Sequence, residues 1–140
     1  CNNMTERLLD PVGGVDAIFE LDALVLFMCV AVTMHAIRNK NCNLLVVGFV
    51  LGYLIETMSL RWGGTHCHAS GLLNFSDCSS ANSVFYYVPW VYSGITCGRR
   101  LVDEKSAAFP FVCGMLFFGI CNVYGSLGPM MRWWLWPDSE

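Results

Sequence analysis

The chain has 140 residues, of which 55% are hydrophobic and only 14% are charged, and its formal net charge is −3. Soluble domains carry roughly 25% charged residues, so this composition argues against an ordinary water-soluble surface and favours one that faces lipid. The eight lysines and arginines form no clustered basic face, which argues against a nucleic-acid partner. The chain begins at Cys1 rather than at methionine, so we expect a trimmed or partial sequence.

The apolar segments predict an all-α fold, a single bundle over residues 1–140 with four transmembrane helices and one structured extracytoplasmic loop. The first predicted span covers residues 17–37. Glu20 and Asp22 lie in its first turns, where acids favour the positive end of the helix dipole. His35, near its other end, has two interpretations: an interfacial residue, or a ligand or proton carrier that faces a neighbouring helix.

The second predicted span covers residues 44–60. Gly48 and Gly52 form a GxxxG pattern, which predicts the close approach of another helix. Glu56 lies about one turn from the end of this span, where a carboxyl group is costly unless it is neutral, paired or near water. We therefore consider two roles for Glu56: a side chain that reaches the interface or pairs with Arg61, or a functional acid.

The third predicted span covers residues 82–97 and has Pro89 near its middle, which predicts a kink because proline removes one backbone hydrogen bond. Tyr86 and Trp90 belong to an aromatic stripe on this segment. Such a stripe favours packing or an interfacial belt, and ligand binding is the alternative.

The fourth predicted span covers residues 107–127 and carries an amide, Asn122, as a candidate ligand-binding residue near its end. Three tryptophans follow closely in the tail. Tryptophan favours the headgroup layer of a membrane, so the tail is expected to form an interfacial anchor. These tryptophans are Trp133, Trp134 and Trp136.

Four spans would place both termini and the loop over residues 62–81 on one side of the membrane. Five of the eight lysines and arginines fall in the two short loops on the other side, which predicts that the short loops are cytoplasmic. Glycosylation sequons at Asn3 and Asn74 fall on the predicted extracytoplasmic or luminal side, where glycosylation occurs. The sequence therefore predicts an integral membrane protein with this orientation.

The loop over residues 62–81 holds Cys67 and Cys78, for which a disulfide is the favoured interpretation because this side permits oxidation. The first alternative is a metal site with the neighbouring histidines and Asp77. Their residue types suit zinc, but their spacing does not. Free thiols are the second alternative, and we expect no metal.

A series of short motifs follows one order along the chain: Glu56, a glycine-rich and histidine-containing stretch over residues 63–68, Val88-Pro89-Trp90, and Gly128-Pro129 with Trp134 and Trp136. This order resembles the membrane hydratases and cyclases of carotenoid biosynthesis. The resemblance implies a long apolar isoprenoid substrate between the helices, with Glu56 as an acid that burial keeps neutral. That family tends to place an acid before the late proline, where this chain has Gly128.

Two functions follow from these observations. The first, favoured because polar groups within the spans are few, is a non-catalytic subunit of a larger membrane assembly. Its candidate ligands are lipid, carotenoid and chlorophyll, and its candidate partners are membrane lipids, other membrane subunits and a second copy of the chain. The second is a membrane enzyme that acts on an isoprenoid or carotenoid. Glu20 and Asp22 lie near the same membrane face as Glu56, so the three are candidate catalytic residues.

Overall fold

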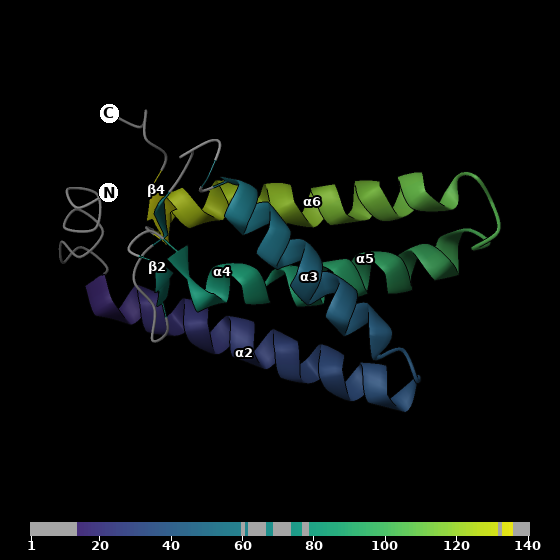
Figure 1. Ribbon diagram of the computed structural model, residues 1–140, viewed down its shortest axis with the longest axis horizontal. Helices are drawn as coiled ribbons and strands as arrows, with labels where there is room; N and C mark the ends of the chain where they lie inside the picture. The colour runs from purple at the N-terminus through teal and green to yellow at the C-terminus, as the bar shows by residue number, and fades with distance from the viewer. Residues whose placement is uncertain are drawn as a thin grey trace.

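In the computed structural model, the described residues are 14–59, 61, 67–68, 74–76, 79–131 and 133–135. The described part of the chain is dominated by helices, which confirms the predicted all-α fold (Figure 1). The third predicted span corresponds to two consecutive helices rather than one. The helices are α2 (Gly14–Arg38), α3 (Asn43–Met58), α4 (Ala81–Phe85), α5 (Tyr87–Leu101) and α6 (Phe109–Met130).

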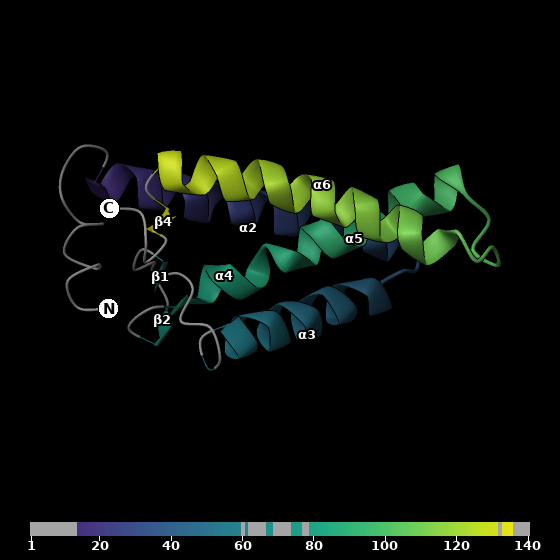
Figure 2. The same cartoon turned by 90° about the horizontal axis from the view of Figure 1, so that it is seen from above.

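Short strands cover one end of this bundle, opposite the connection between α5 and α6 (Figure 2). Strand β1 (Cys67–His68) pairs antiparallel with β4 (Trp134–Leu135), and His68 lies opposite Trp134. Strand β2 (Asn74–Ser76) pairs with β3 (Ser79–Ser80). The segment between α3 and α4 therefore meets the segment after α6 at this end, which we call the strand-covered end.

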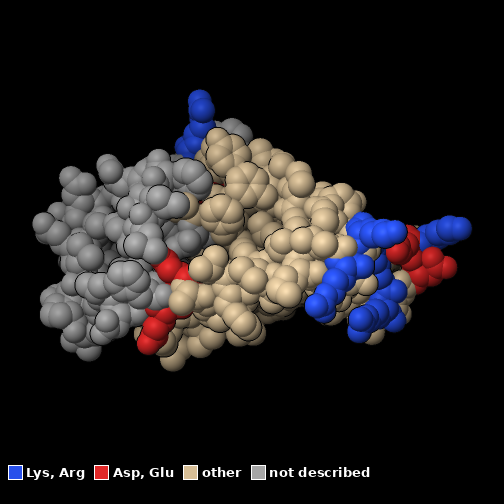
Figure 3. Space-filling view, turned by 90° about the horizontal axis from the view of Figure 1, so that it is seen from below, with Lys and Arg blue, Asp and Glu red and all other residues tan. Residues whose placement is uncertain are grey.

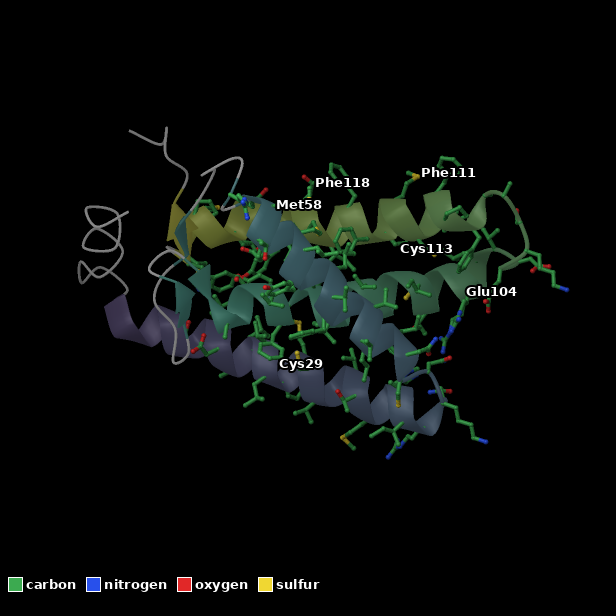
Figure 4. All side chains as sticks on the ribbon, in the orientation of Figure 1. Cys29, Met58, Glu104, Phe111, Cys113 and Phe118 are labelled. Carbon is green, nitrogen blue, oxygen red and sulfur yellow. The ribbon has the colours of Figure 1, made fainter. Side chains whose placement is uncertain are left out.

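Helix α5 lies at the centre of the bundle and packs against α3, α6 and α2. It is the least apolar of the long helices, yet it contributes more buried side chains than any other described helix. The apolar α2, α3 and α6 surround it and turn large hydrophobic side chains outward. Figure 4 shows Phe111 and Phe118 of α6 pointing away from α5, and both are at least 66% exposed.

The break between α4 and α5 has a local cause in Pro89. Proline has no amide hydrogen, so the carbonyl of Phe85, four residues earlier, loses its helical donor. The structure supplies another donor: the thiol of Cys29 on α2 lies 3.5 Å from that carbonyl oxygen. The predicted kink is thus a break at Tyr86, three residues before the proline.

The prediction of a close helix approach at the GxxxG pattern is confirmed, and the approaching segment belongs to the same chain. A Cβ atom added at Gly48 would lie 2.8 Å from the Cα atom of Val88. One added at Gly52 would lie 2.6 Å from the carbonyl oxygen of Val84. Only glycine lets the backbone of α3 rest directly on α4 and α5.

Among the described residues, two helices are long and apolar enough to cross a membrane: Glu20–Arg38 within α2, and α6. The core helix of a soluble protein can meet the same criteria, but it would be mostly buried. Only 17% and 6% of these two apolar windows are buried inside the bundle. In the view of Figure 3, charged side chains gather at one end and beside the grey residues, and the face between these two regions carries almost none.

Candidate functional site

Glu56 is buried inside the bundle, with 4% of its surface exposed. It follows Gly48 and Gly52 at four-residue spacing, so it shares the face of α3 that rests on α4 and α5. Arg61 is exposed and makes no ion pair with Glu56. The predicted pairing with Arg61 is therefore not found, because the glycine face turns the Glu56 side chain inward, and its depth relative to a membrane interface stays a prediction.

Tyrosine hydroxyl groups surround the carboxyl group of Glu56. The Tyr87 hydroxyl donates a hydrogen bond of 3.4 Å to Glu56 Oε1. Tyr86 and Tyr124 lie close enough to Glu56 to interact with it electrostatically, and their own rings pack at a centroid distance of 4.8 Å. Tyr87 thus contacts the acid directly, while Tyr86 and Tyr124 lie within electrostatic range of it.

Aromatic rings form the wall around these hydroxyl groups. Trp90 stacks on Tyr86 at a ring-centroid distance of 5.2 Å and meets Tyr124 edge to face at 4.6 Å. Trp133, after α6, packs on Tyr124 at 5.6 Å. We call these residues the Glu56 cluster: Glu56, Tyr86, Tyr87, Trp90, Tyr124 and Trp133.

Helix α2 brings a second carboxyl group to the edge of the Glu56 cluster. Asp22 is half-buried and lies close enough to Tyr124 to interact with it electrostatically. Leu21 and Val25, on either side of it, are buried against the aromatic rings. Glu20 is exposed. Of the two acids predicted to approach Glu56, the structure therefore brings Asp22 to the cluster and leaves Glu20 at the surface.

Three members of the Glu56 cluster were not among the predicted site residues: Tyr87, Tyr124 and Trp133. Tyr87 had a signal, since it precedes Trp90 by three residues and so shares a helix face with it. Trp133 was predicted to be an interfacial anchor, but it is only 8% exposed. Its backbone amide donates a hydrogen bond of 2.8 Å to the carbonyl oxygen of Gly128. This turn after α6 places the indole ring against the Tyr124 ring.

The remaining predicted ligand-binding residues lie apart from the Glu56 cluster. His35, near the other end of α2, has its Nδ1 atom 2.7 Å from the Tyr92 hydroxyl. Asn122 is exposed on the outer face of α6 and has no hydrogen-bond partner among the described residues. Within the part of the chain that the structure describes, no group of three His, Cys, Asp or Glu side chains could hold a metal ion.

The predicted chemistry of the loop falls largely outside the described residues. Asn3 and Cys78 are not described, and only the backbone of Cys67 and Asn74 is described, in β1 and β2. The Cys67–Cys78 disulfide and both glycosylation sites therefore stay predictions. Five cysteines elsewhere in the described chain are free thiols: Cys29, Cys42, Cys97, Cys113 and Cys121.

The Glu56 cluster combines groups of types that take part in acid–base chemistry elsewhere. It contains a buried carboxyl group, hydroxyl groups that can orient it, a second carboxyl group at the edge and aromatic faces that can stabilise positive charge. Comparisons with protein-family models, curated proteins and solved structures find no match for this chain. Function therefore has to follow from the geometry of the cluster.

Proposed function

We propose that the protein is an integral membrane protein with four spanning segments: α2, α3, the α4–α5 pair and α6. The strand-covered end faces the extracytoplasmic or luminal side, and the short loops face the cytoplasm. The outward apolar side chains of α2, α3 and α6 support this placement, because they would contact acyl chains. Lysines and arginines gathered at the opposite end support the orientation (Figure 3).

Cysteine labelling tests this orientation on the native chain. Cys42 and Cys97 are exposed near the basic end. A maleimide that cannot cross membranes should label Cys42 in permeabilised cells and not in intact cells, with labelled peptides identified by mass spectrometry. Labelling of Cys42 in intact cells would place the basic end outside and contradict the proposal.

We further propose that the protein is a membrane enzyme that protonates a double bond of an isoprenoid or carotenoid substrate. The observation that carries this proposal is the burial of Glu56 within a ring of tyrosines and tryptophans, with Asp22 at the edge. A carboxyl group that served only as a polar anchor near the membrane surface would gain nothing from this burial, which is costly in an apolar region.

The motifs that carry the resemblance to carotenoid hydratases and cyclases also lie near one another. Glu56 and Trp90 belong to the same cluster, and buried Gly128 accepts the hydrogen bond that places Trp133 there. His68 pairs with Trp134 at the same strand-covered end. The proximity of Glu56, Trp90 and the turn at Gly128 supports a shared site for these three motifs.

In the proposed step the Glu56 carboxyl group donates a proton to one carbon of the double bond. The neighbouring carbon becomes a cation, which the faces of Tyr86, Trp90 and Tyr124 would stabilise. The cation then ends in one of two ways: water adds to it and loses a proton, or a neighbouring carbon loses a proton to restore a double bond. Asp22 would accept this proton. The proposal predicts that the Glu56→Gln variant no longer converts an isoprenoid substrate.

Exposed Asn122 favours a second candidate function, the non-catalytic subunit. It lies on the outer face of α6 among large apolar side chains, where an amide without a hydrogen-bond partner is costly in lipid. An amide can donate to and accept from another amide, so a partner helix, from another subunit or a second copy, would satisfy it. In this case the Glu56 cluster would serve to hold the helices together.

Asn122→Leu tests the subunit function. Amide hydrogen bonds between membrane helices contribute about 1–2 kcal/mol in model peptides, so the variant should associate roughly tenfold more weakly. Native mass spectrometry of the protein released from its own membranes would measure this, with Phe118→Leu on the same exposed face as control. If Asn122→Leu leaves every complex intact, the amide does not hold a partner.

A further inference from the structure

A groove lies between α2 and α5, is lined by none of the residues of the Glu56 cluster, and has a volume of about 300 Å³. Ala31 and Val32 of α2 form one wall, and Ser93 and Cys97 of α5 form part of the other. The small side chains of Ala31 and Ser93 leave space where the two helices would otherwise pack. The lining is almost entirely apolar, so the groove suits a hydrocarbon chain better than a soluble ion.

Polar groups are concentrated on one side of the groove. The hydrogen bond between His35 and Tyr92 holds their rings edge to face, with a centroid distance of 5.7 Å. Thr96 also lines the groove, and its hydroxyl oxygen is buried. The exposed His35 ring can bond to the ester or phosphate oxygens of a lipid that enters from the membrane.

Arg100 lies at the mouth of the groove, one helical turn beyond Thr96, at the basic end of the bundle. Its neighbour Arg99 is already engaged, by Glu104 at 3.1 Å and by the side chain of Asn41 at 3.2 Å. Arg100 is exposed and forms no ion pair with a described carboxylate. Its guanidinium group is therefore free to bind an anion at the membrane surface.

We propose that this groove binds one acyl chain of an anionic phospholipid, whose phosphate group contacts Arg100. The apolar walls match the chain, and the cation at the mouth matches the phosphate. Basic sites between membrane helices on the cytoplasmic side recognise anionic lipids in this way. The inference rests on the proposed membrane placement, and it does not depend on catalysis at Glu56.

Lipid selectivity of the full-length protein tests the proposal. Native mass spectrometry in detergent would compare phosphatidylglycerol with phosphatidylcholine of identical chains. We expect phosphatidylglycerol to bind about fivefold more tightly, since one basic residue near the surface contributes roughly 1 kcal/mol. Arg100→Gln should remove this preference. Lys105→Gln, the same charge change at an exposed position outside the groove, should keep it.

Two further measurements separate the groove from general charge attraction. Ala31→Phe, at an exposed position, would fill the groove and should weaken the binding of both lipids. Soluble glycerol phosphate, which has no acyl chain, should not displace phosphatidylglycerol. Three results would each overturn the proposal. The first is equal binding of the two lipids, and the second is an equal loss of the phosphatidylglycerol preference in Arg100→Gln and Lys105→Gln. The third is displacement of phosphatidylglycerol by glycerol phosphate. Recovery of the protein in water without detergent would instead contradict the membrane placement.

Discussion

Glu56→Gln is expected to lower turnover of an isoprenoid substrate by roughly 10²–10⁴-fold, the usual contribution of a general acid. Glutamine has the size of glutamate and can still accept the hydrogen bond from Tyr87, but it has no acidic proton to transfer. The fold should therefore survive while the chemistry stops. The measurement uses protein in lipid vesicles with lycopene or squalene in heavy water, because protonation of a double bond would introduce deuterium into the hydrocarbon.

Glu20→Gln is the matched control, since Glu20 is an exposed acid on α2. It should incorporate deuterium as the wild-type protein does. Normal incorporation by Glu56→Gln would contradict the role of Glu56 as the acid. If the wild-type protein incorporates none with either substrate, and Asn122→Leu weakens its complexes, the subunit function is the better account. The two candidate functions thus give opposite results in two independent measurements.

Gly52→Ala is expected to destabilise the fold strongly, although it adds only one methyl group. The new Cβ atom would lie 2.6 Å from the carbonyl oxygen of Val84 and 2.9 Å from Tyr87 Cβ, so α3 would have to move away from α4 and α5. Overpacking of this kind typically costs about 1–3 kcal/mol. The melting temperature in detergent should fall by roughly 5–10 °C, on the scale found for domains of similar size.

Gly119→Ala is the control for this effect. Gly119 is an exposed glycine of α6, and a Cβ atom there would meet nothing within 4 Å. Its melting temperature should match that of the wild-type protein or rise slightly, because alanine favours a helix. Similar shifts in both variants would show that the backbone contact between Gly52 and α4 does not determine stability.

The positions of the long helices follow closely from the sequence. The spans predicted at residues 17–37, 44–60 and 107–127 correspond to α2, α3 and α6 within a few residues at each end. Length and hydropathy are local properties, so the chain needs no tertiary contact to display them. The third span was harder to define, because Pro89 breaks it before its own position, at the carbonyl that loses its donor.

The sequence predicts which face of its helix Glu56 occupies, but not which side chains surround it. Its four-residue spacing from Gly48 and Gly52 places it on the face where another helix approaches, and this follows from helical periodicity alone. Which side chains meet it there depends on how α2 and α6 rotate about their axes. Hydropathy does not encode this rotation in helices that are apolar on nearly every face. The partners on α6, Tyr124 above all, therefore could not be identified.

The sequence by itself determined the class of molecule: apolar helices, sparse charge and one suspicious acid, because composition and spacing are readable along the chain. Only the tertiary structure decided that this acid is buried, that Trp133 turns inward to meet its aromatic neighbours, and that Asp22 rather than Glu20 borders them. These outcomes depend on packing between segments distant in the sequence. Glycine contacts along α3 and the turn after α6 provide that packing.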